Sequence, residues 1–242
     1  MPSLTAYKSD LDYGYAPGVF PSMECLLNRP QSARRLLLHS RAQGTEGAEK
    51  LTALAEKLHV RIEIADKALA RISGKENCFA AAVFEKFDDG LAKGKPHVVL
   101  HNPSDCGNAG TILRTALGFG VEDVALIRPC VDVFDPRVVR ASMGSLFSLR
   151  VRTYDTFEDY LAEHPGRGMY PFMLDGSRSL PDVLAGDISP DWTLIFGNEG
   201  SGLPPEFQHI GQPVRIPSND RIDSLNLSIA AGIAIYTFSQ KK

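Results

Sequence analysis

The sequence predicts an α/β fold with a parallel sheet in its larger, C-terminal part, and three observations predict it. From His97 onward, short apolar segments alternate with helical segments, as in a parallel sheet covered by helices on both sides. Several of the apolar segments are continuous, as expected of strands buried on both faces. A glycine-rich segment, residues 197–202, follows the apolar residues 192–196, and glycine lets the backbone approach a ligand closely. Ligands bind beyond the carboxyl ends of such strands, so this loop marks the expected ligand site.

The N-terminal part predicts a smaller α/β unit, which we expect to span residues 17–87. Asp66 is placed to cap a helix in which Leu69 and Ile72 face inward. Residues 1–16 show no periodicity and are expected to form a flexible N-terminus. Residues 88–96 are polar, contain Gly and Pro, and are expected to be a linker. The apolar pattern predicts helices over residues 21–27 and 44–58, and strands over residues 34–39, 60–64 and 79–87.

The apolar pattern of the larger part, residues 97–242, predicts the strands of the parallel sheet and the helices that cover it. Its last helix is apolar nearly all round, so it should be buried on more than one side. The polar residues Ser224, Asn226 and Ser228 lie in its first turn, where a helix start can hold an anion or donate to a ligand. We expect strands over residues 97–101, 123–127, 149–153, 170–174, 192–196 and 214–216, and helices over residues 108–117, 136–145, 157–164 and 224–236.

Composition narrows the class of protein. The chain has 242 residues, 43% of them hydrophobic and 23% charged, as in a soluble globular protein with one large domain or two small ones. No apolar run is long enough to span a bilayer, and the first residues lack the apolar core of a signal peptide. The four cysteines are scattered, which favours reduced thiols in a cytoplasmic protein. The six histidines lack the spacing of metal ligands, so no metal is expected.

Three motifs occur in order along the larger part. The first, residues 102–120, contains Asn108 and Arg114, and the second, residues 195–203, contains Glu199. The third is Ile216-Pro217, followed by Ser-Leu-Asn-Leu-Ser at residues 224–228. Together they resemble the motifs of the SpoU (TrmH-like) family of RNA 2′-O-ribose methyltransferases, within the SPOUT class, and they span nearly all of the larger part.

This resemblance implies a fold, a cofactor and partners. It implies a C-terminal trefoil knot and an S-adenosyl-L-methionine site built from the knotted loops. It also implies a homodimer with the site at the subunit interface, and a ribosomal-protein-like RNA-binding domain at residues 17–87. Some positions depart from the family pattern, which affects the expected shape of the cofactor loop and the substrate contacts. They are Ser218, Asp220 and Asp223 in the third motif, and Asn77-Cys78-Phe79 where the family has His-Gln-Gly.

The resemblance implies that the cofactor is bound mainly by backbone groups of three loops. The implied cofactor-binding residues are Leu174, Asp175, Gly176, Phe196, Gly197, Asn198, Glu199, Gly200, Ile216, Ser224 and Leu225.

The family assigns the central catalytic role to the arginine of the first motif, here Arg114. A guanidinium stays protonated in proteins, so we expect Arg114 to bind the adjacent phosphate and to stabilise charge on the 2′-oxygen, rather than to act as a base. Asn108, Glu199, Ser224 and Asn226 would position the ribose or hold Arg114. Glu199 has an alternative role as a structural carboxylate bonded to backbone amides.

Any contact with RNA must depend on local charge, because the net charge is only −3. The candidate RNA-binding residues are Arg34, Arg35, Arg137 and Arg140, the last two within a segment that holds five arginines between Arg128 and Arg152. An ordinary solvated surface explains these arginines equally well, and this alternative stays open.

The leading functional hypothesis is S-adenosylmethionine-dependent methylation of a ribose 2′-hydroxyl, with rRNA and tRNA both open as substrates. One alternative is a SPOUT relative that methylates a base nitrogen, which the Ser-Leu-Asn motif disfavours. The other is a non-catalytic RNA-binding or assembly factor. A dinucleotide fingerprint, a phosphate-binding Gly-Lys-Ser/Thr loop and a nucleophile elbow are absent from the sequence.

Overall fold

The computed structural model describes residues 4–73, 78–219 and 221–241, and it divides into two compact units. The small unit comprises residues 1–87 and 132–148, and the large unit comprises residues 88–131 and 149–242. The boundary after residue 87 lies where the sequence indicates it. Residues 132–148 differ from the expectation, because they pack with the small unit although they lie within the larger part of the sequence.

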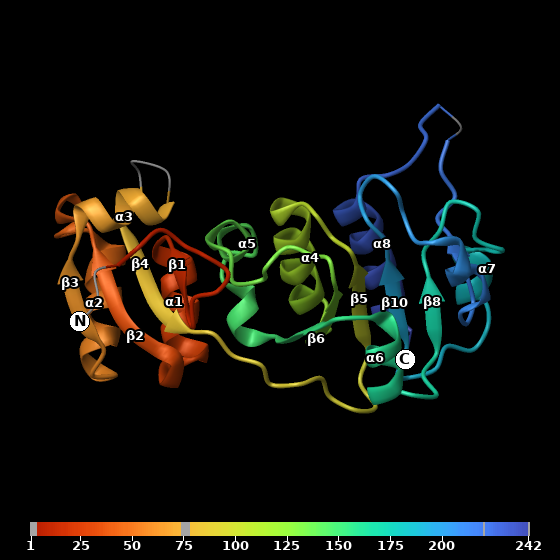
Figure 1. Ribbon diagram of the computed structural model, residues 1–242, viewed down its shortest axis with the longest axis horizontal. Coiled ribbons are helices and arrows are strands. Elements are labelled where there is room, and N and C mark those ends of the chain that lie inside the picture. The colour runs from red at the N-terminus through yellow and green to blue at the C-terminus, as the bar shows by residue number, and fades with distance from the viewer. Residues whose placement is uncertain (1–3, 74–77, 220, 242) are drawn as a thin grey trace. The chain divides into compact units, whose positions relative to one another are not determined.

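The small unit is built on a four-stranded sheet in the order β1-β4-β2-β3 (Figure 1). Strands β2 and β3 are parallel, and the other pairs are antiparallel. Apolar residues of α1 and α2 pack on one face of the sheet, and those of α3 pack on the other. The elements are β1 (Tyr13–Pro17), α1 (Val19–Asn28), β2 (Ala33–Leu38), α2 (Glu46–Lys57), β3 (Arg61–Ile64), α3 (Asp66–Ser73) and β4 (Ala80–Glu85), with 3-10 turns at Pro30–Ser32 and Ser40–Ala42.

The expectation of a flexible N-terminus through residue 16 is wrong at its end, because residues 13–17 form strand β1. Tyr15 and Ala16 are fully buried, and the strand pairs with β4 along its length. The strand was not predicted because glycine, here Gly14, is uncommon in strands. A Cβ at this position would lie 2.7 Å from the ring of Phe84, so the sheet has no room for a side chain there.

Asp66 does not cap α3 as the sequence suggests. Its carboxylate accepts hydrogen bonds from the backbone N–H of Ser40 at 2.7 Å and from the Ser40 hydroxyl at 2.6 Å. Leu69 and Ile72 are buried as expected. In the segment Asn77-Cys78-Phe79, which replaces the family's His-Gln-Gly, Asn77 lies outside the described residues.

Residues 132–148 join the small unit through aromatic packing and charge. They contain α5 (Pro136–Ala141) and a 3-10 turn at Ser145–Ser148. The ring of Phe147 packs edge-on against Phe84 at a centroid distance of 4.8 Å, and its carbonyl accepts a hydrogen bond from Arg29. Gly144 has a φ of 83°, and a Cβ there would lie 2.7 Å from the Cβ of Glu24. The absence of a side chain at Gly144 therefore permits the segment to pack closely against α1.

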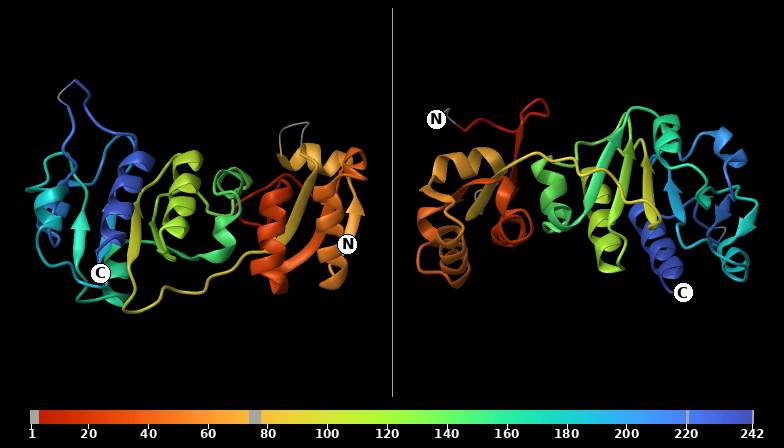
Figure 2. Two further views of the ribbon diagram at one scale, coloured as in Figure 1. Left: turned by 180° about the vertical axis from the view of Figure 1, so that it is seen from behind. Right: turned by 90° about the horizontal axis from the view of Figure 1, so that it is seen from below.

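The large unit contains a five-stranded sheet in the order β7-β6-β5-β10-β8, with every neighbouring pair parallel. A separate pair, β9 and β11, is also parallel. Helices α4 and α8 lie together on one face of the sheet, and α6 lies on the other (Figure 2). The elements are β5 (His97–His101), α4 (Cys106–Gly118), β6 (Asp123–Ile127), β7 (Arg150–Tyr154), α6 (Phe157–Glu163), β8 (Met169–Pro171), β9 (Arg178–Ser179), α7 (Leu180–Leu184), β10 (Thr193–Phe196), β11 (Val214–Arg215) and α8 (Leu227–Ser239), with a 3-10 turn at Pro205–His209.

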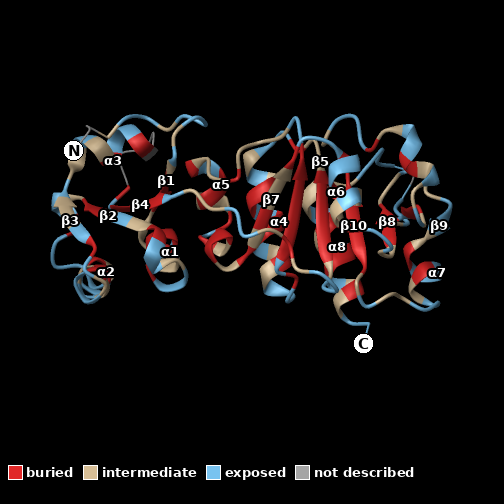
Figure 3. Cartoon of the chain, turned by 60° about the horizontal axis from the view of Figure 1, so that its bottom comes forward, coloured by how far each residue is buried: buried red, intermediate tan, exposed pale blue. Residues whose placement is uncertain are grey.

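The five central strands agree with the sequence-based expectation, whereas β9 and α7 are too short to have been predicted. Strands β5, β6 and β10 are almost entirely buried (Figure 3). Along the chain, the sheet grows outward from β5 through β6 and β7. Strand β8 then forms the opposite edge, and β10 fills the place between β8 and β5. The switch in strand order therefore falls between β5 and β10, which is where parallel sheets bind ligands.

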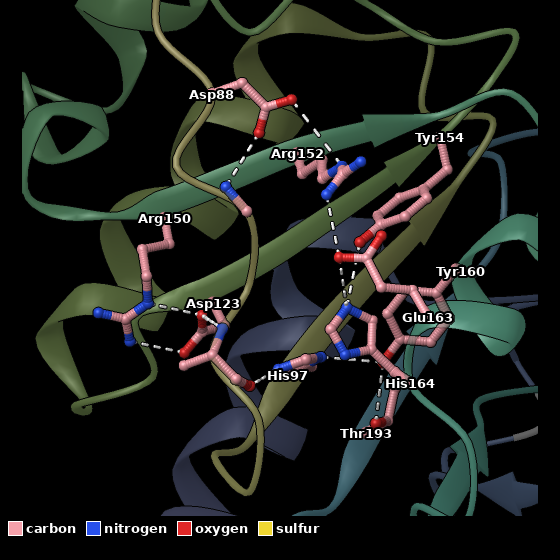
Figure 4. Close-up of polar contacts among 12 residues, drawn as sticks. Asp88, His97, Asp123, Arg150, Arg152, Tyr154, Tyr160, Glu163, His164 and Thr193 are labelled. Carbon is pink, nitrogen blue, oxygen red and sulfur yellow. Dashed lines mark hydrogen bonds and ion pairs between the residues drawn. The ribbon is translucent and has the colours of Figure 1, made fainter.

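Residues 88–96 contain no helix or strand, as expected of a linker, but they are fixed to the large unit. The backbone N–H of Ala92 donates to Asp123 at 2.8 Å, and the Ala92 carbonyl accepts from the ring of His97 at 2.8 Å (Figure 4). Arg150 closes the other side of Asp123 with two hydrogen bonds of 2.7 Å. These contacts lie at the amino ends of β5, β6 and β7, opposite the expected ligand edge. In the described part of the chain, no helix is long and apolar enough to cross a membrane.

His97 makes the stability of the large unit depend on pH. The side chain is fully buried, and its second ring nitrogen bonds to the hydroxyl of Tyr160 at 3.0 Å. Burial, with a smaller effect of the nearby Arg167, lowers the pKa of His97 to about 4. The unfolded chain, with a His pKa of about 6.5, therefore takes up the proton first. We expect the free energy of unfolding to fall as the pH is lowered from about 6.5 towards 4.

The measurement is urea unfolding followed by the fluorescence of Trp192, the single tryptophan, which lies in the large unit. His97→Gln can keep the donor to the Ala92 carbonyl but cannot titrate, so its loss of stability over this pH range should be shallower. The exposed His209→Gln should behave like the unaltered protein. An equal slope in His97→Gln and the unaltered protein would contradict the assignment.

Candidate active site

A cavity of about 410 Å³ lies in the large unit, at the carboxyl edge of the sheet. Its walls come from the segments that follow β8 and β10, from β11 and the loop after it, and from the first turn of α8. The lining residues are Phe172, Met173, Leu174, Asp175, Phe196, Gly197, Asn198, Glu199, Gly200, Ser201, Gly202, Leu203, Val214, Arg215, Ile216, Ser218, Ser224, Leu225, Leu227 and Ala230.

The structure brings together the residues that the sequence assigns to the cofactor. All of them line the cavity except Gly176. Gly176 packs instead against β11, because a Cβ there would lie 2.5 Å from the carbonyl carbon of Val214. The sequence missed Phe172, Ser201, Arg215 and other lining residues, although they adjoin the predicted ones. Ser218 lines the cavity, Asp223 is exposed outside it, and Asp220 lies outside the described residues.

The glycine-rich loop after β10 closes on itself. The backbone groups of Asn198 and Gly202 exchange hydrogen bonds of 3.1 and 3.0 Å, and the Asn198 side chain accepts from the N–H of Gly200 at 2.9 Å. Gly197 has no space for a side chain, since a Cβ there would lie 2.1 Å from the carbonyl carbon of Gly202. The glycines therefore serve to fold the loop tightly at the cavity wall.

Glu199 is committed to hydrogen bonds within the chain. Its carboxylate accepts from the backbone N–H groups of Ser104 and Asp105, both at 3.0 Å, and from the Ser104 hydroxyl at 2.7 Å. The side-chain amide of Asn108 donates to it at 3.3 Å. Burial acts to raise the pKa of Glu199, but the hydrogen bonds from Ser104 and Asp105 outweigh it and lower the pKa to about 2. These contacts support the alternative role of a structural carboxylate.

Asn108 and Asn226 join the first motif to the third. The amide of Asn226 donates to Asn108 at 3.1 Å, and its oxygen accepts from the N–H of Ser228 at 2.9 Å. Asn226 is thus the N-cap of α8, which begins three residues later than the sequence suggests. Ser224 precedes the helix and lines the cavity. Glu199, Asn108 and Asn226, one from each motif, therefore form one hydrogen-bonded network.

Arg114 lies apart from this network. It is exposed on α4, six residues beyond Asn108, which corresponds to about 9 Å along the helix axis. Within the described part of the chain its guanidinium makes no hydrogen bond or ion pair, and it does not line the cavity. One chain by itself therefore leaves Arg114 outside the cofactor cavity.

The four predicted RNA-binding arginines all lie in the small unit. Arg34 bonds to Asp12 at 2.8 Å and to Glu85, and Arg35 lies 3.5 Å from Glu63. Arg137 pairs with Asp135 at 2.8 Å and keeps 74% of its side chain exposed. Arg140 is half-buried on α5. Across the described ranges, no cluster of His, Cys, Asp or Glu could hold a metal ion.

The parallel sheet, with a cavity at its carboxyl edge that is walled by a glycine-rich loop and the start of the last helix, has the α/β fold typical of SPOUT methyltransferases. The chain belongs to the SpoU rRNA Methylase family, whose family model matches residues 95–236. A 23S rRNA (adenosine(1067)-2′-O)-methyltransferase of Streptomyces laurentii is 31% identical over 197 residues, which cover 77% of this chain and 72% of that protein. An uncharacterized tRNA/rRNA methyltransferase of Synechocystis is 30% identical over 190 residues, covering 76% and 68%.

Solved structures agree with this assignment. An rRNA methyltransferase from Sinorhizobium meliloti with bound AdoMet has a TM-score of 0.78 at 27% identity, covering 95% of this chain and 87% of that one. The SpoU methyltransferase AviRb from Streptomyces viridochromogenes, in complex with AdoMet, shares the fold with a TM-score of 0.79 at 24% identity, covering 95% and 90%. The predicted family, α/β fold, enzyme class of RNA 2′-O-methyltransferase and S-adenosyl-L-methionine cofactor are confirmed.

Glu199→Gln tests how much the hydrogen bonds between the first and second motifs contribute to the free energy of unfolding. The change keeps the size of the side chain but removes the charge, and hydrogen bonds to charged groups contribute about 1.5–3 kcal/mol. We expect the free energy of unfolding of the large unit to fall by about 2–3 kcal/mol at neutral pH, measured by urea unfolding and Trp192 fluorescence. The matched control is Glu206→Gln, an exposed carboxylate in the turn at Pro205–His209, which should change stability by less than about 0.5 kcal/mol. Equal stability of the two variants would show that Glu199 has no such structural role.

Proposed function

We propose that the protein transfers the methyl group of S-adenosyl-L-methionine to a ribose 2′-hydroxyl of rRNA or tRNA, with its three motifs as the active site. The observation that carries the proposal is the network of Glu199, Asn108 and Asn226 beside the cavity. Each residue comes from a different motif, so the network assembles the site from segments far apart in the sequence.

The cavity suits the cofactor. Its volume of about 410 Å³ lies within the roughly 300–1,000 Å³ of small-molecule sites. Phe196, Leu225 and the backbone of residues 197–200 offer an apolar wall and polar main-chain groups for an adenine ring. When bound, S-adenosylmethionine supplies a methyl group that its own sulfonium charge activates. The chain must then hold the 2′-oxygen in line with that methyl group and stabilise the charge that develops on the oxygen.

We assign to Arg114 the stabilisation of the charge on the 2′-oxygen. Because Arg114 does not line the cavity of its own chain, this role requires a second copy of the chain. The exposed apolar residues Phe119, at the C-terminal end of α4, and Ile229, Ile233 and Tyr236, on α8, form a face that we call the α4–α8 face. The rings of Phe119 and Tyr236 pack together at 5.3 Å. The sequence predicted that α8 is buried on more than one side, yet this side is exposed in the single chain. A homodimer formed through this face would bury it and would bring Arg114 of one subunit towards the cavity of the other.

The small unit is proposed to bind the RNA substrate. Arg34 is partly exposed and its ion pairs with the exposed Asp12 and Glu85 contribute only about 0–1 kcal/mol each, so a phosphate can replace these carboxylates. Arg137 keeps 74% of its side chain exposed. The trefoil knot and a cytoplasmic location also belong to this proposal. The relatives named as 2′-O-methyltransferases disfavour the alternatives of a base methyltransferase and of a non-catalytic RNA-binding factor.

The decisive experiment incubates the protein with methyl-labelled S-adenosylmethionine and with rRNA or tRNA, and then digests the RNA to nucleosides. Label on the ribose supports the proposal, and label only on a base, or no label, contradicts it. Arg114→Ala should lower the rate about 10²–10³-fold, as expected for the loss of one charge-stabilising donor, with unchanged S-adenosylmethionine affinity in calorimetry. Arg221→Ala serves as the control and should retain full activity, because this exposed arginine does not line the cavity.

Ile233→Asp tests the α4–α8 face. A buried unpaired carboxylate is costly, so the variant should be monomeric in analytical ultracentrifugation and should lose methyl transfer. The cofactor cavity is lined by residues of a single chain, so the variant should lose less cofactor affinity than methyl-transfer activity. The control is Ile222→Asp, an isoleucine 48% exposed in the loop before α8, which should remain dimeric. A dimeric, active Ile233→Asp variant would place the interface elsewhere.

A further inference from the structure

Two charges in the cofactor cavity have no partner within the described part of the chain. Charged residues in its lining are Asp175, Glu199 and Arg215. The carboxylate of Glu199 is occupied by its hydrogen bonds to the first motif. By contrast, the side chains of Asp175 and Arg215 make no hydrogen bond or ion pair with any described residue. The cavity therefore presents one uncommitted anion and one uncommitted cation.

The backbone places these two residues on adjacent segments. The N–H of Met173 donates to the carbonyl of Val214 at 2.9 Å, so the segment after β8 runs beside β11. Gly176 lies directly against that strand, because a Cβ there would be 2.8 Å from the backbone nitrogen of Arg215. Asp175 precedes Gly176 and is thus next to Arg215 in space, yet the two side chains do not form an ion pair with each other.

Arg215 lines the cavity and is also exposed. The neighbouring Val214 is fully buried. A ligand in the cavity can therefore meet the charge of Arg215 without displacing packed side chains. A carboxylate that enters a cavity already lined by Asp175 and Glu199 requires a compensating cation, and Arg215 is the cation in that lining.

We propose that Arg215 and Asp175 bind the amino-acid end of S-adenosylmethionine, the guanidinium pairing with its carboxylate and the aspartate with its ammonium group. A planar guanidinium suits a carboxylate because it can donate two parallel hydrogen bonds. This assignment rests on the proposed function, since it places the cofactor in the cavity. It adds a charge contact to a site that otherwise offers backbone and apolar groups.

The test compares two ligands by calorimetry. S-adenosylhomocysteine carries the amino-acid end, and 5′-methylthioadenosine has the same adenosine and sulfur but lacks that end. Arg215→Gln should weaken S-adenosylhomocysteine binding at least tenfold and should change methylthioadenosine binding less than twofold. Asp175→Asn should show the same selectivity with a smaller effect. Arg221→Gln, which removes an equal charge from the neighbouring loop, should alter neither.

Each outcome decides the proposal. If Arg215→Gln weakens both ligands equally, or weakens neither, the assignment is overturned. If it raises the KM for RNA while S-adenosylhomocysteine affinity stays unchanged, Arg215 binds RNA phosphate instead. If neither ligand binds the unaltered protein, the cavity is not the cofactor site and the proposed function is contradicted. This result is distinct from one that contradicts only the role of Arg215. Raising the salt concentration should weaken S-adenosylhomocysteine binding to the unaltered protein more than to Arg215→Gln, because the lost contact is between charges.

Discussion

The carboxylate of Glu199 is the constraint on which the active site depends. It belongs to the loop after β10, while its donors Ser104, Asp105 and Asn108 belong to the loop after β5 and to the start of α4. The backbone N–H groups at a helix start have no partners within the helix, and they carry a partial positive charge. A single anion therefore fixes two loops from adjacent strands, at the point where the strand order reverses. Asn108 then holds Asn226, so the start of α8 is placed by the same chain of contacts.

The two edges of the large sheet use polar residues differently. At the amino edge, Asp123, His97 and Thr193 are buried and bonded to other groups of the chain, including Arg150, Tyr160 and Arg167. This edge holds the strands and residues 88–96 in place. At the carboxyl edge, backbone groups of the glycine-rich loop and the side chains of Asp175 and Arg215 are available to a ligand. The separation lets the stabilising network be fully satisfied without using the groups that bind the cofactor.

The sequence was sufficient for the features that are local or that repeat a motif. Continuous apolar runs identified β5, β6 and β10, and the residues predicted from the motifs to bind the cofactor line one cavity, with the exception of Gly176. Long-range packing was not visible. Nothing near Gly14 indicates that Phe84 covers it, and nothing near residues 132–148 indicates that Phe147 packs against Phe84. Arg215 was missed because it lies one residue before Ile216-Pro217, where its role depends on the neighbouring segment at Asp175 and Gly176.

The ion pairs within the chain separate arginines that stabilise the fold from arginines that are available to a ligand. The sequence alone could not make this distinction. Arg150 makes a two-pronged contact with the buried Asp123, which raises the pKa of Arg150, so its removal would leave a buried anion without its partner. Arg34 has acidic partners that are 76% and 56% exposed, and water can compensate these when a phosphate takes the guanidinium. Arg114 and Arg215 have no such partner among the described residues. A charge that the fold leaves unused costs little in the free protein and is available to a ligand or to a second copy of the chain. The function of these two arginines therefore has to be sought outside the single chain.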